Sequence, residues 1–201
     1  MTDNAAFDEI FGDVPLMAIL RGMGPERSLA VATTAWDLGI GVVEIPVQTP
    51  ADVEALRLVA DAARERGLIV GAGTVVTVDH VHDARRAGAA FTVSPGFDPE
   101  IVRASAEAGL PALPGVATPT EVQLALREGL TWLKAFPASL LGTGWFGAMR
   151  GPFPQATFVA TGGMDATTAG PFFDAGVRVV AVGSALEDEA QLPALAALLA
   201  R

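Results

Sequence analysis

A short unit recurs along this chain of 201 residues. In each copy, a polar helix end leads through a glycine into a short apolar strand. Six glycines mark the unit: Gly39, Gly67, Gly88, Gly109, Gly129 and Gly176. A glycine at this place is typical of the residue that ends a helix in the left-handed conformation. Helices that alternate regularly with short apolar strands indicate a parallel α/β fold.

The repeat predicts eight strands. Two apolar segments without the glycine complete the set: Leu16–Leu20 before the first unit and Ala156–Ala160 before the last. Eight strand–helix units in one domain, residues 1–201, indicate a compact (β/α)8 TIM barrel, small for a class of typically ~250 residues. An open doubly wound sheet is the alternative. Such a sheet carries a Gly-x-Gly-x-x-Gly turn after its first strand, and this chain does not.

Several helix starts are also marked in the sequence. Thr49–Pro50, Asp98–Pro99 and Thr118–Pro119 each place a capping residue before a proline at the first helical position. Glu121 adds a capping box to the third of these. The helix after the seventh strand is the least regular, because Gly170–Pro171 falls in its middle.

Lys134 is the single lysine among thirteen basic residues, and it lies in the apolar run 130–137. Arginine keeps its proton near neutral pH, whereas lysine can lose it, and only a neutral amine attacks a carbonyl. The pattern suggests a Schiff-base nucleophile. The alternative is a composition bias towards arginine, with one remaining lysine that reaches the surface.

Composition excludes several classes of partner. The net charge of −10 argues against nucleic acid or an anionic membrane as a partner. No apolar stretch approaches a membrane helix, and the acidic N-terminus lacks signal-peptide features, so we expect a cytoplasmic protein. There is no cysteine, and His80 and His82 are spaced to lie on different helix faces. We therefore expect no metal site and no cofactor.

In a (β/α)8 barrel, the carboxyl ends of the strands meet at one mouth, where the chemistry takes place. Arg21 ends the first expected strand, Glu44 ends the second, and Lys134 lies on the sixth. Burial and the charge of Arg21 would lower the pKa of Lys134, as a nucleophilic amine requires. Glu44 is a candidate proton shuttle. The alternative is a structural ion pair of Glu44 with Arg21 or Lys134, which would keep the amine charged.

Two glycine-containing turns follow the last two strands. Gly162–Gly163 comes after the seventh strand and Gly183–Ser184 after the eighth. This pair of turns is the usual phosphate site of the fold, because glycines let backbone N–H groups approach the phosphate. The alternative is that the glycines only permit tight turns.

Together these motifs resemble the 2-keto-3-deoxy-6-phosphogluconate and 2-keto-3-deoxy-6-phosphogalactonate aldolases, which are class I enzymes. The resemblance runs from about Pro15 to Leu186. The segments that carry it are Ala18–Gly22, Val43–Pro46, Gly71–Val75, Ser94–Gly96, Pro114–Gly115, Leu133–Pro137, Gly151–Pro154, Thr161–Gly163 and Val182–Ala185. Family members are similar in forming trimers, so the resemblance implies a homotrimer.

The resemblance also implies roles for individual residues. Lys134 would form the Schiff base and Glu44 would relay protons through a water. The residues implied to bind substrate are Arg21, Gln48, Thr74, Pro95 and Phe136 around the keto acid, and Gly162, Gly163, Gly183 and Ser184 around the phosphate.

Position 48 distinguishes branches of the family. Many phosphogluconate-type members carry an arginine four residues after the catalytic glutamate, and this chain has Gln48 there. That looks like the phosphogalactonate branch, although the stereochemistry at C4 of the substrate stays open.

The sequence therefore predicts a class I aldolase that cleaves a 2-keto-3-deoxy-6-phosphosugar acid, of the 6-phosphogalactonate or 6-phosphogluconate type. Its products would be pyruvate and glyceraldehyde 3-phosphate, and its partner a small phosphorylated keto acid. One alternative is a 4-hydroxy-2-oxoglutarate aldolase. The other is a phosphosugar isomerase barrel in which Lys134 acts only through its charge.

Overall fold

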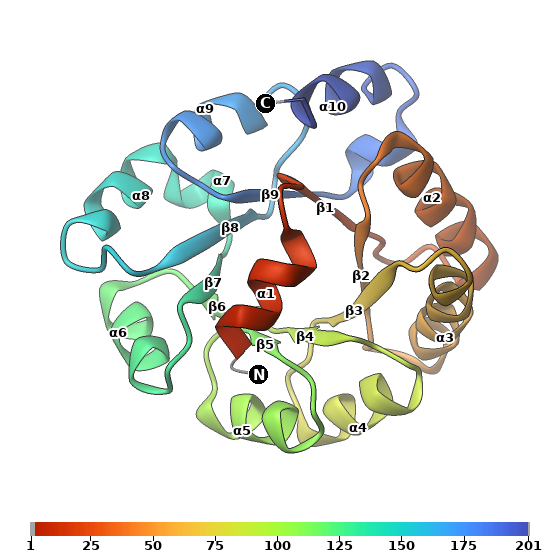
Figure 1. Cartoon of the computed structure of the whole chain (residues 1–201), viewed down its shortest axis with the longest axis horizontal. Coiled ribbons are helices and arrows are strands. Elements are labelled where there is room, and N and C mark those ends of the chain that lie inside the picture. Colours follow the sequence, from red (N-terminus) through yellow and green to blue (C-terminus); the bar gives the residue numbers. More distant parts are fainter. Residues whose placement is uncertain (1–2, 201) are drawn as a thin grey trace.

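The computed structural model describes residues 3–200, whose strands form a nearly closed barrel (Figure 1). Nine parallel strands are joined in the order β5-β4-β3-β2-β1-β9-β8-β7-β6. They are β1 (Leu16–Ile19), β2 (Val42–Pro46), β3 (Ile69–Gly73), β4 (Phe91–Val93), β5 (Ala112–Leu113), β6 (Gly115–Val116), β7 (Trp132–Ala135), β8 (Thr157–Thr161) and β9 (Val179–Val182). Strand β1 pairs with both β2 and β9, so the first and last strands are neighbours.

The fifth expected strand is divided at Pro114. Proline has no backbone N–H, so it cannot donate to a strand ladder. Strand β5 pairs with β4 and strand β6 pairs with β7, so the two halves connect the two ends of the sheet. The Pro114 carbonyl accepts a hydrogen bond from the Lys134 N–H at 2.9 Å. The predicted (β/α)8 barrel is thus confirmed, with its fifth strand in two pieces.

Helices surround the sheet (Figure 1). They are α2 (Pro25–Leu38), α3 (Pro50–Glu65), α4 (Val78–Arg86), α5 (Pro99–Glu107), α6 (Pro119–Arg127), α7 (Ala138–Leu141), α8 (Thr143–Arg150), α9 (Ala169–Asp174) and α10 (Leu192–Leu198), with a short 3-10 helix η1 (Ser184–Glu187). Thr49, Asp98 and Thr118 cap their helices as predicted. The irregular α9 is only six residues long. None of the helices within residues 3–200 has the length and apolar character of a membrane span.

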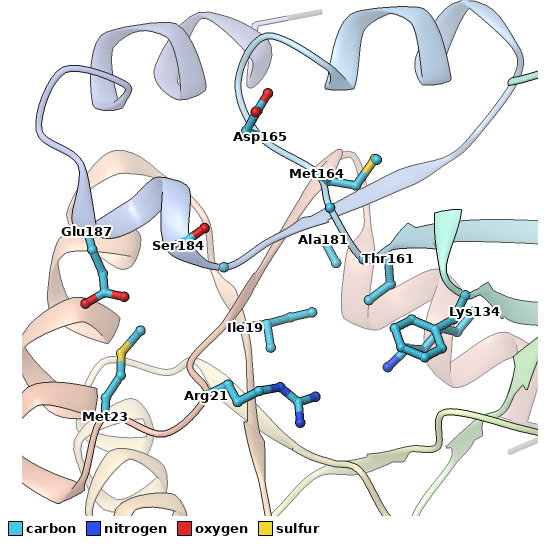
Figure 2. Close-up of a pocket in the computed structure, with 14 residues that line it drawn as sticks. Ile19, Arg21, Met23, Lys134, Thr161, Met164, Asp165, Ala181, Ser184 and Glu187 are labelled. Atoms are coloured by element: carbon cyan, nitrogen blue, oxygen red, sulfur yellow. The ribbon is translucent and has the colours of Figure 1, made fainter. Parts of the chain in front are cut away.

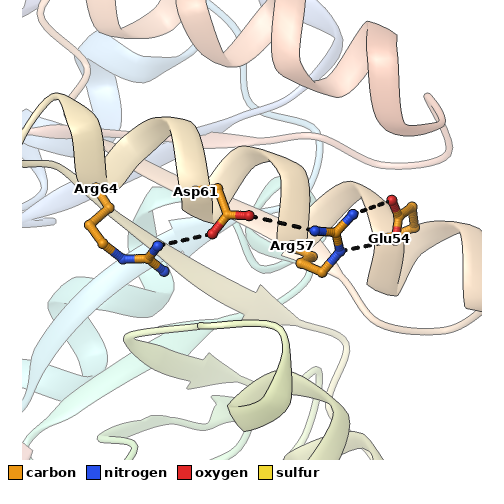
Figure 3. A network of polar contacts seen from close by, with 4 residues as sticks. All are labelled: Glu54, Arg57, Asp61 and Arg64. Carbon is orange, nitrogen blue, oxygen red and sulfur yellow. Dashed lines mark hydrogen bonds and ion pairs between the residues drawn. The ribbon is translucent and has the colours of Figure 1, made fainter.

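Two arginines on the surface of α3 form ion pairs with acidic residues of the same helix. Arg57 lies between Glu54 and Asp61, and Asp61 also pairs with Arg64 (Figure 3). All four side chains are at least half exposed, so each pair contributes little to stability. These arginines are ordinary surface charges with acidic partners.

A helix that the sequence analysis did not predict covers one end of the barrel. Helix α1 (Asp3–Phe11) lies across the barrel opening in Figure 1. Its Phe7 and Phe11 are buried, and the ring of Phe11 stacks on Trp132 at 5.2 Å between centroids. The indole N–H of Trp132 donates to Asp8 at 3.0 Å. Because Trp132 and Phe91 begin their strands, α1 closes the amino-terminal end and leaves the carboxyl end open.

The barrel interior is layered, because residues two apart on a strand share a face. Beside α1 lies an apolar layer that includes Val42, Trp132 and Val159. Two residues further along the same strands stand Glu44, Lys134 and Thr161, all buried. The alternation of the strands therefore places a polar layer directly above the apolar one.

Truncation of a buried side chain of α1 should destabilise the fold without changing the residues at the carboxyl end of the barrel. We expect Phe11→Ala to lower the free energy of unfolding by about 3–5 kcal/mol, as is usual for a buried phenylalanine. Urea denaturation measures this change. Leu140→Ala is the control, since Leu140 is 83% exposed and should change stability by less than about 0.5 kcal/mol. Equal stabilities of the two variants would contradict the role assigned to α1.

Candidate active site

A cavity of about 450 Å³ opens at the carboxyl ends of β1, β7, β8 and β9 (Figure 2). Seven of the predicted site residues line it: Arg21, Lys134, Phe136, Gly162, Gly163, Gly183 and Ser184. The structure thus brings together a cation, an amine and both glycine-containing turns. Glu44, Gln48, Thr74 and Pro95 are not part of this lining.

Lys134 is buried at the inner end of the cavity, with 2% of its surface exposed. Its Nζ lies 5.1 Å from the centre of the Phe136 ring. Burial lowers the pKa of the Lys134 amine; the charge of Glu44 opposes this effect and the charge of Arg21 adds to it. A buried amine with a lowered pKa is the form of lysine that attacks carbonyl groups.

Glu44 is fully buried on β2, and both of its carboxylate oxygens lack a hydrogen-bond partner within the part of the chain that the structure describes. The ion pair with Arg21 or Lys134, weighed as an alternative from the sequence, is absent among residues 3–200. Gly73 makes room for the carboxylate, because a Cβ there would lie 2.0 Å from Glu44 Oε1. A buried carboxylate without a protein partner is free to accept hydrogen bonds from a water or a ligand.

Arg21 is exposed at the cavity but has two fixed partners. Its Nη1 donates to Gln48 Oε1 at 3.0 Å and its Nη2 donates to Thr74 Oγ1 at 3.1 Å. Thr74 has φ 56°, in the left-handed region that β-branched residues rarely adopt. Strain of this kind persists only where the surroundings enforce it, and it is common at functional sites.

The first glycine turn packs closely against its neighbours. Gly162 has φ 99°, and a Cβ there would lie 3.2 Å from the Phe136 ring. Gly163 has φ 73°, and a Cβ there would lie 2.5 Å from Ser139 Oγ. Tight turns therefore need these glycines whatever the ligand, and the turns also line the cavity.

Pro95 lies apart from this cavity. It lines a smaller one of about 240 Å³, together with Ser94 and Phe97. Its carbonyl stands against Gly115, where a Cβ would lie 2.1 Å from the Pro95 oxygen. Its predicted contact with substrate stays a prediction.

The sequence analysis missed several residues of the lining. Thr161 is the most informative, because its buried hydroxyl has no partner in residues 3–200. Two acidic residues, Asp165 and Glu187, also line the cavity. The alternation of β8 from Val159 is the signal that could have identified Thr161. Asp165 lies in a loop and Glu187 in the short helix η1, where no such alternation exists.

Both acidic residues of the lining have partners. The Asp165 carboxylate accepts hydrogen bonds from the N–H and hydroxyl groups of Thr167 and Thr168, which lower the pKa of Asp165. Glu187 forms an ion pair with Arg27. Arg27 therefore offsets the negative charge of Glu187, whereas Asp165 keeps its charge and is held in place by neutral donors.

The histidines of α4 stay outside this site. The Nδ1 atom of His80 accepts a hydrogen bond from the Val76 N–H at 3.4 Å. Among the side chains that the structure describes, no three His, Asp or Glu residues gather as a metal site.

A barrel of parallel strand–helix units, with a buried amine at its open end, has the architecture of a Schiff-base aldolase. The family model described as KDPG and KHG aldolase matches residues 7–197, so the chain belongs to that family. The resemblance predicted from the sequence is confirmed. The protein is an aldolase, that is, a carbon–carbon lyase.

Two curated relatives are similar over most of the chain. The chain is 35% identical over 173 residues to a probable 2-dehydro-3-deoxy-6-phosphogalactonate aldolase of Rhizobium meliloti strain 1021, covering 86% of this chain and 81% of the relative. It is 35% identical over 174 residues to the 2-dehydro-3-deoxy-6-phosphogalactonate aldolase of Escherichia coli K12, covering 86% and 84%.

Solved structures agree with this assignment. A 4-hydroxy-2-oxoglutarate and 2-dehydro-3-deoxyphosphogluconate aldolase superposes with a TM-score of 0.83 at 36% identity, covering 95% of this chain and 97% of that one. A structure described as native KDPGal has a TM-score of 0.81 at 32% identity, covering 93% and 91%.

The lowered pKa of Lys134 has a consequence for stability. The unfolded chain binds the proton of Lys134 up to a pKa of about 10.4, and the folded chain releases it at lower pH. The free energy of unfolding therefore rises with pH between the two pKa values. At a pH below both values, each unit by which the folded pKa is lowered reduces the free energy of unfolding by about 1.4 kcal/mol.

We expect Lys134→Met to be more stable than the natural chain at pH 7, with a difference that narrows towards pH 10. Urea denaturation at several pH values measures this. The same comparison in a Glu44→Gln background removes the carboxylate whose charge raises the pKa of Lys134. A difference that does not vary with pH would contradict a lowered pKa in the folded state.

Proposed function

We propose that Lys134 forms a Schiff base with the C2 ketone of a 2-keto-3-deoxy-6-phosphosugar acid, which the enzyme cleaves to pyruvate and glyceraldehyde 3-phosphate. The observation that carries this proposal is the burial of the single lysine at the inner end of the cavity, with a lowered pKa. The names of the relatives, which are aldolases of phosphogalactonate and phosphogluconate type, support the substrate class.

In the proposed reaction, Nζ of Lys134 attacks C2 and water leaves, which gives an iminium that accepts electrons. Glu44, through a water, takes the proton of the C4 hydroxyl, and the C3–C4 bond breaks as its electron pair moves towards the iminium. Glyceraldehyde 3-phosphate departs and leaves an enamine. Glu44 directs a proton to C3 of the enamine, and water then releases pyruvate from Lys134. The buried, unpartnered carboxylate of Glu44 supports this role.

Substrate binding divides between the two ends of the cavity. Arg21 binds the carboxylate of the keto acid, beside Thr74, and Phe136 packs against the carbon chain. The Gly162–Gly163 and Gly183–Ser184 turns donate to the phosphate. The cavity of about 450 Å³ lies within the range typical of small-molecule sites.

The assignment to the phosphogalactonate type rests on Gln48 and on two relatives of that name. Cleavage of 4-hydroxy-2-oxoglutarate is the second candidate, since one similar structure carries both activities in its description. A large rate preference for the phosphorylated substrate would favour the first candidate.

A homotrimer in the cytoplasm completes the proposal. A designed cage made by fusing symmetric oligomeric domains superposes with a TM-score of 0.81 at 30% identity, covering 93% of this chain and 70% of that one. Sedimentation of the purified protein tests the trimer.

Borohydride should trap the covalent intermediate. With pyruvate and borohydride, we expect the intact mass to increase by one reduced pyruvyl group, and a peptide digest to place it on Lys134. The N-terminus is the competing amine, and Lys134→Arg is the matched control, since it keeps the charge but not the nucleophile. If the folded protein forms no adduct, the Schiff-base role proposed for Lys134 is overturned.

Substitution at the first glycine turn should affect the phosphorylated acceptor selectively. In the condensation of pyruvate with an aldehyde, we expect Gly163→Ala to raise KM for glyceraldehyde 3-phosphate by about tenfold. The added Cβ would clash with Ser139 and displace the backbone N–H from the phosphate, which weakens a hydrogen bond to a charged group. KM for glyceraldehyde should change far less. Steady-state kinetics with both aldehydes measure this. Equal effects on both would mean that the turn shapes the cavity and does not bind phosphate.

A further inference from the structure

The guanidinium of Arg21 is held by two neutral groups. Gln48 and Thr74 each accept one of its hydrogen bonds, at 3.0 and 3.1 Å. Neither partner carries a charge, so Arg21 keeps its positive charge for a ligand. Arg21 is exposed, and a free arginine side chain loses much rotamer freedom when it binds. Gln48 and Thr74, the two anchors of this side chain, already restrict its rotamers, so less conformational entropy is lost when substrate binds.

The anchors stand on the ends of two adjacent strands. Gln48 follows β2 and Thr74 follows β3. The Val47 N–H donates to the Gly73 carbonyl at 3.0 Å, one residue before each anchor. This backbone bond fixes the two strand ends to each other. The φ of 56° at Thr74 indicates that its hydroxyl is held in place at a conformational cost.

Gln48 itself does not line the cavity, although Arg21 does. The Gln48 oxygen is directed to the guanidinium. The contact that this geometry gives Gln48 at the site is its hydrogen bond with Arg21, which does line the cavity.

We propose that Gln48 is a positioning residue, which acts on the substrate only through Arg21 by fixing the guanidinium where it binds the carboxylate of the keto acid. The inference rests on the proposed function and deepens it, because it names the group that orients the carboxylate-binding cation.

The neutrality of Gln48 also matters for Lys134. The charged groups that act on the amine are Glu44 on β2 and Arg21, which follows β1; Asp165 and Glu187 also line the cavity. Arg21 contributes to the lowered pKa of Lys134. A carboxylate in place of Gln48 would pair with Arg21 and weaken that contribution.

A double-mutant cycle tests the proposal. Gln48→Leu is made in the natural chain and in an Arg21→Met background, and KM for pyruvate is measured in condensation with glyceraldehyde 3-phosphate. We expect Gln48→Leu to raise KM about tenfold in the natural chain, and less than about twofold once Arg21 is absent. Gln123→Leu, at an exposed position of α6, is the matched control and should leave KM unchanged.

The cycle separates the two possible roles of Gln48. If Gln48→Leu raises KM by the same factor in both backgrounds, Gln48 contacts the substrate directly and the proposal is overturned. No effect in the natural chain overturns it as well.

Gln48→Glu gives a second, independent readout. We expect the acid limb of the pyruvate-trapping rate with borohydride to move to higher pH by about half a unit, since the amine then needs a higher pH to lose its proton. KM for pyruvate should also rise by more than tenfold, because the new carboxylate competes for Arg21. Gln123→Glu adds the same charge away from the site. An acid limb and a KM that both match this control would overturn the proposal.

Failure of the two proposals can be told apart. A natural chain that does not trap pyruvate at all overturns the Schiff-base function and, with it, the role of Gln48. If the natural chain traps pyruvate but Gln48→Leu raises KM by the same factor with and without Arg21, only the role of Gln48 is overturned.

Discussion

The amine of Lys134 lies in a buried polar layer of the barrel interior, and the proposed chemistry of the site depends on that burial. Desolvation disfavours the ammonium form and is the main reason why the pKa of Lys134 is lowered. The nearly closed ring of strands makes the burial possible, because side chains from several strands fill its interior in layers. The aromatic layer below, capped by α1, keeps water out from the other end.

The charges around the amine are few and separated. Glu44 opposes the lowering of the pKa of Lys134 but forms no ion pair with it, and Arg21 acts in the same direction as burial. In a chain with a net charge of −10, a local arrangement of this kind is needed to attract an anionic substrate. Of the two acidic residues that line the cavity, Glu187 is paired with Arg27, and Asp165 accepts hydrogen bonds from two threonines.

Rigid strand ends place the polar groups of the site. Backbone bonds between neighbouring strands hold Gln48 next to Thr74, and both hold Arg21. Groups fixed in this way before substrate arrives lose less freedom on binding than groups on mobile loops. The same backbone and side-chain hydrogen bonds hold Thr74 in place, and so its strained φ persists.

The sequence by itself determined the barrel and indicated its candidate nucleophile. The recurring glycine and apolar strand predict the eight units, because local pattern controls strand alternation and helix ends. The single lysine in an apolar run predicts the buried amine that the structure shows. Only the tertiary structure decided which groups meet. Helix α1, the partners of Arg21, the unpartnered hydroxyl of Thr161 and the ion pair of Glu187 with Arg27 all depend on contacts between distant segments. No local periodicity records such contacts, since they arise only when the strands close into a ring.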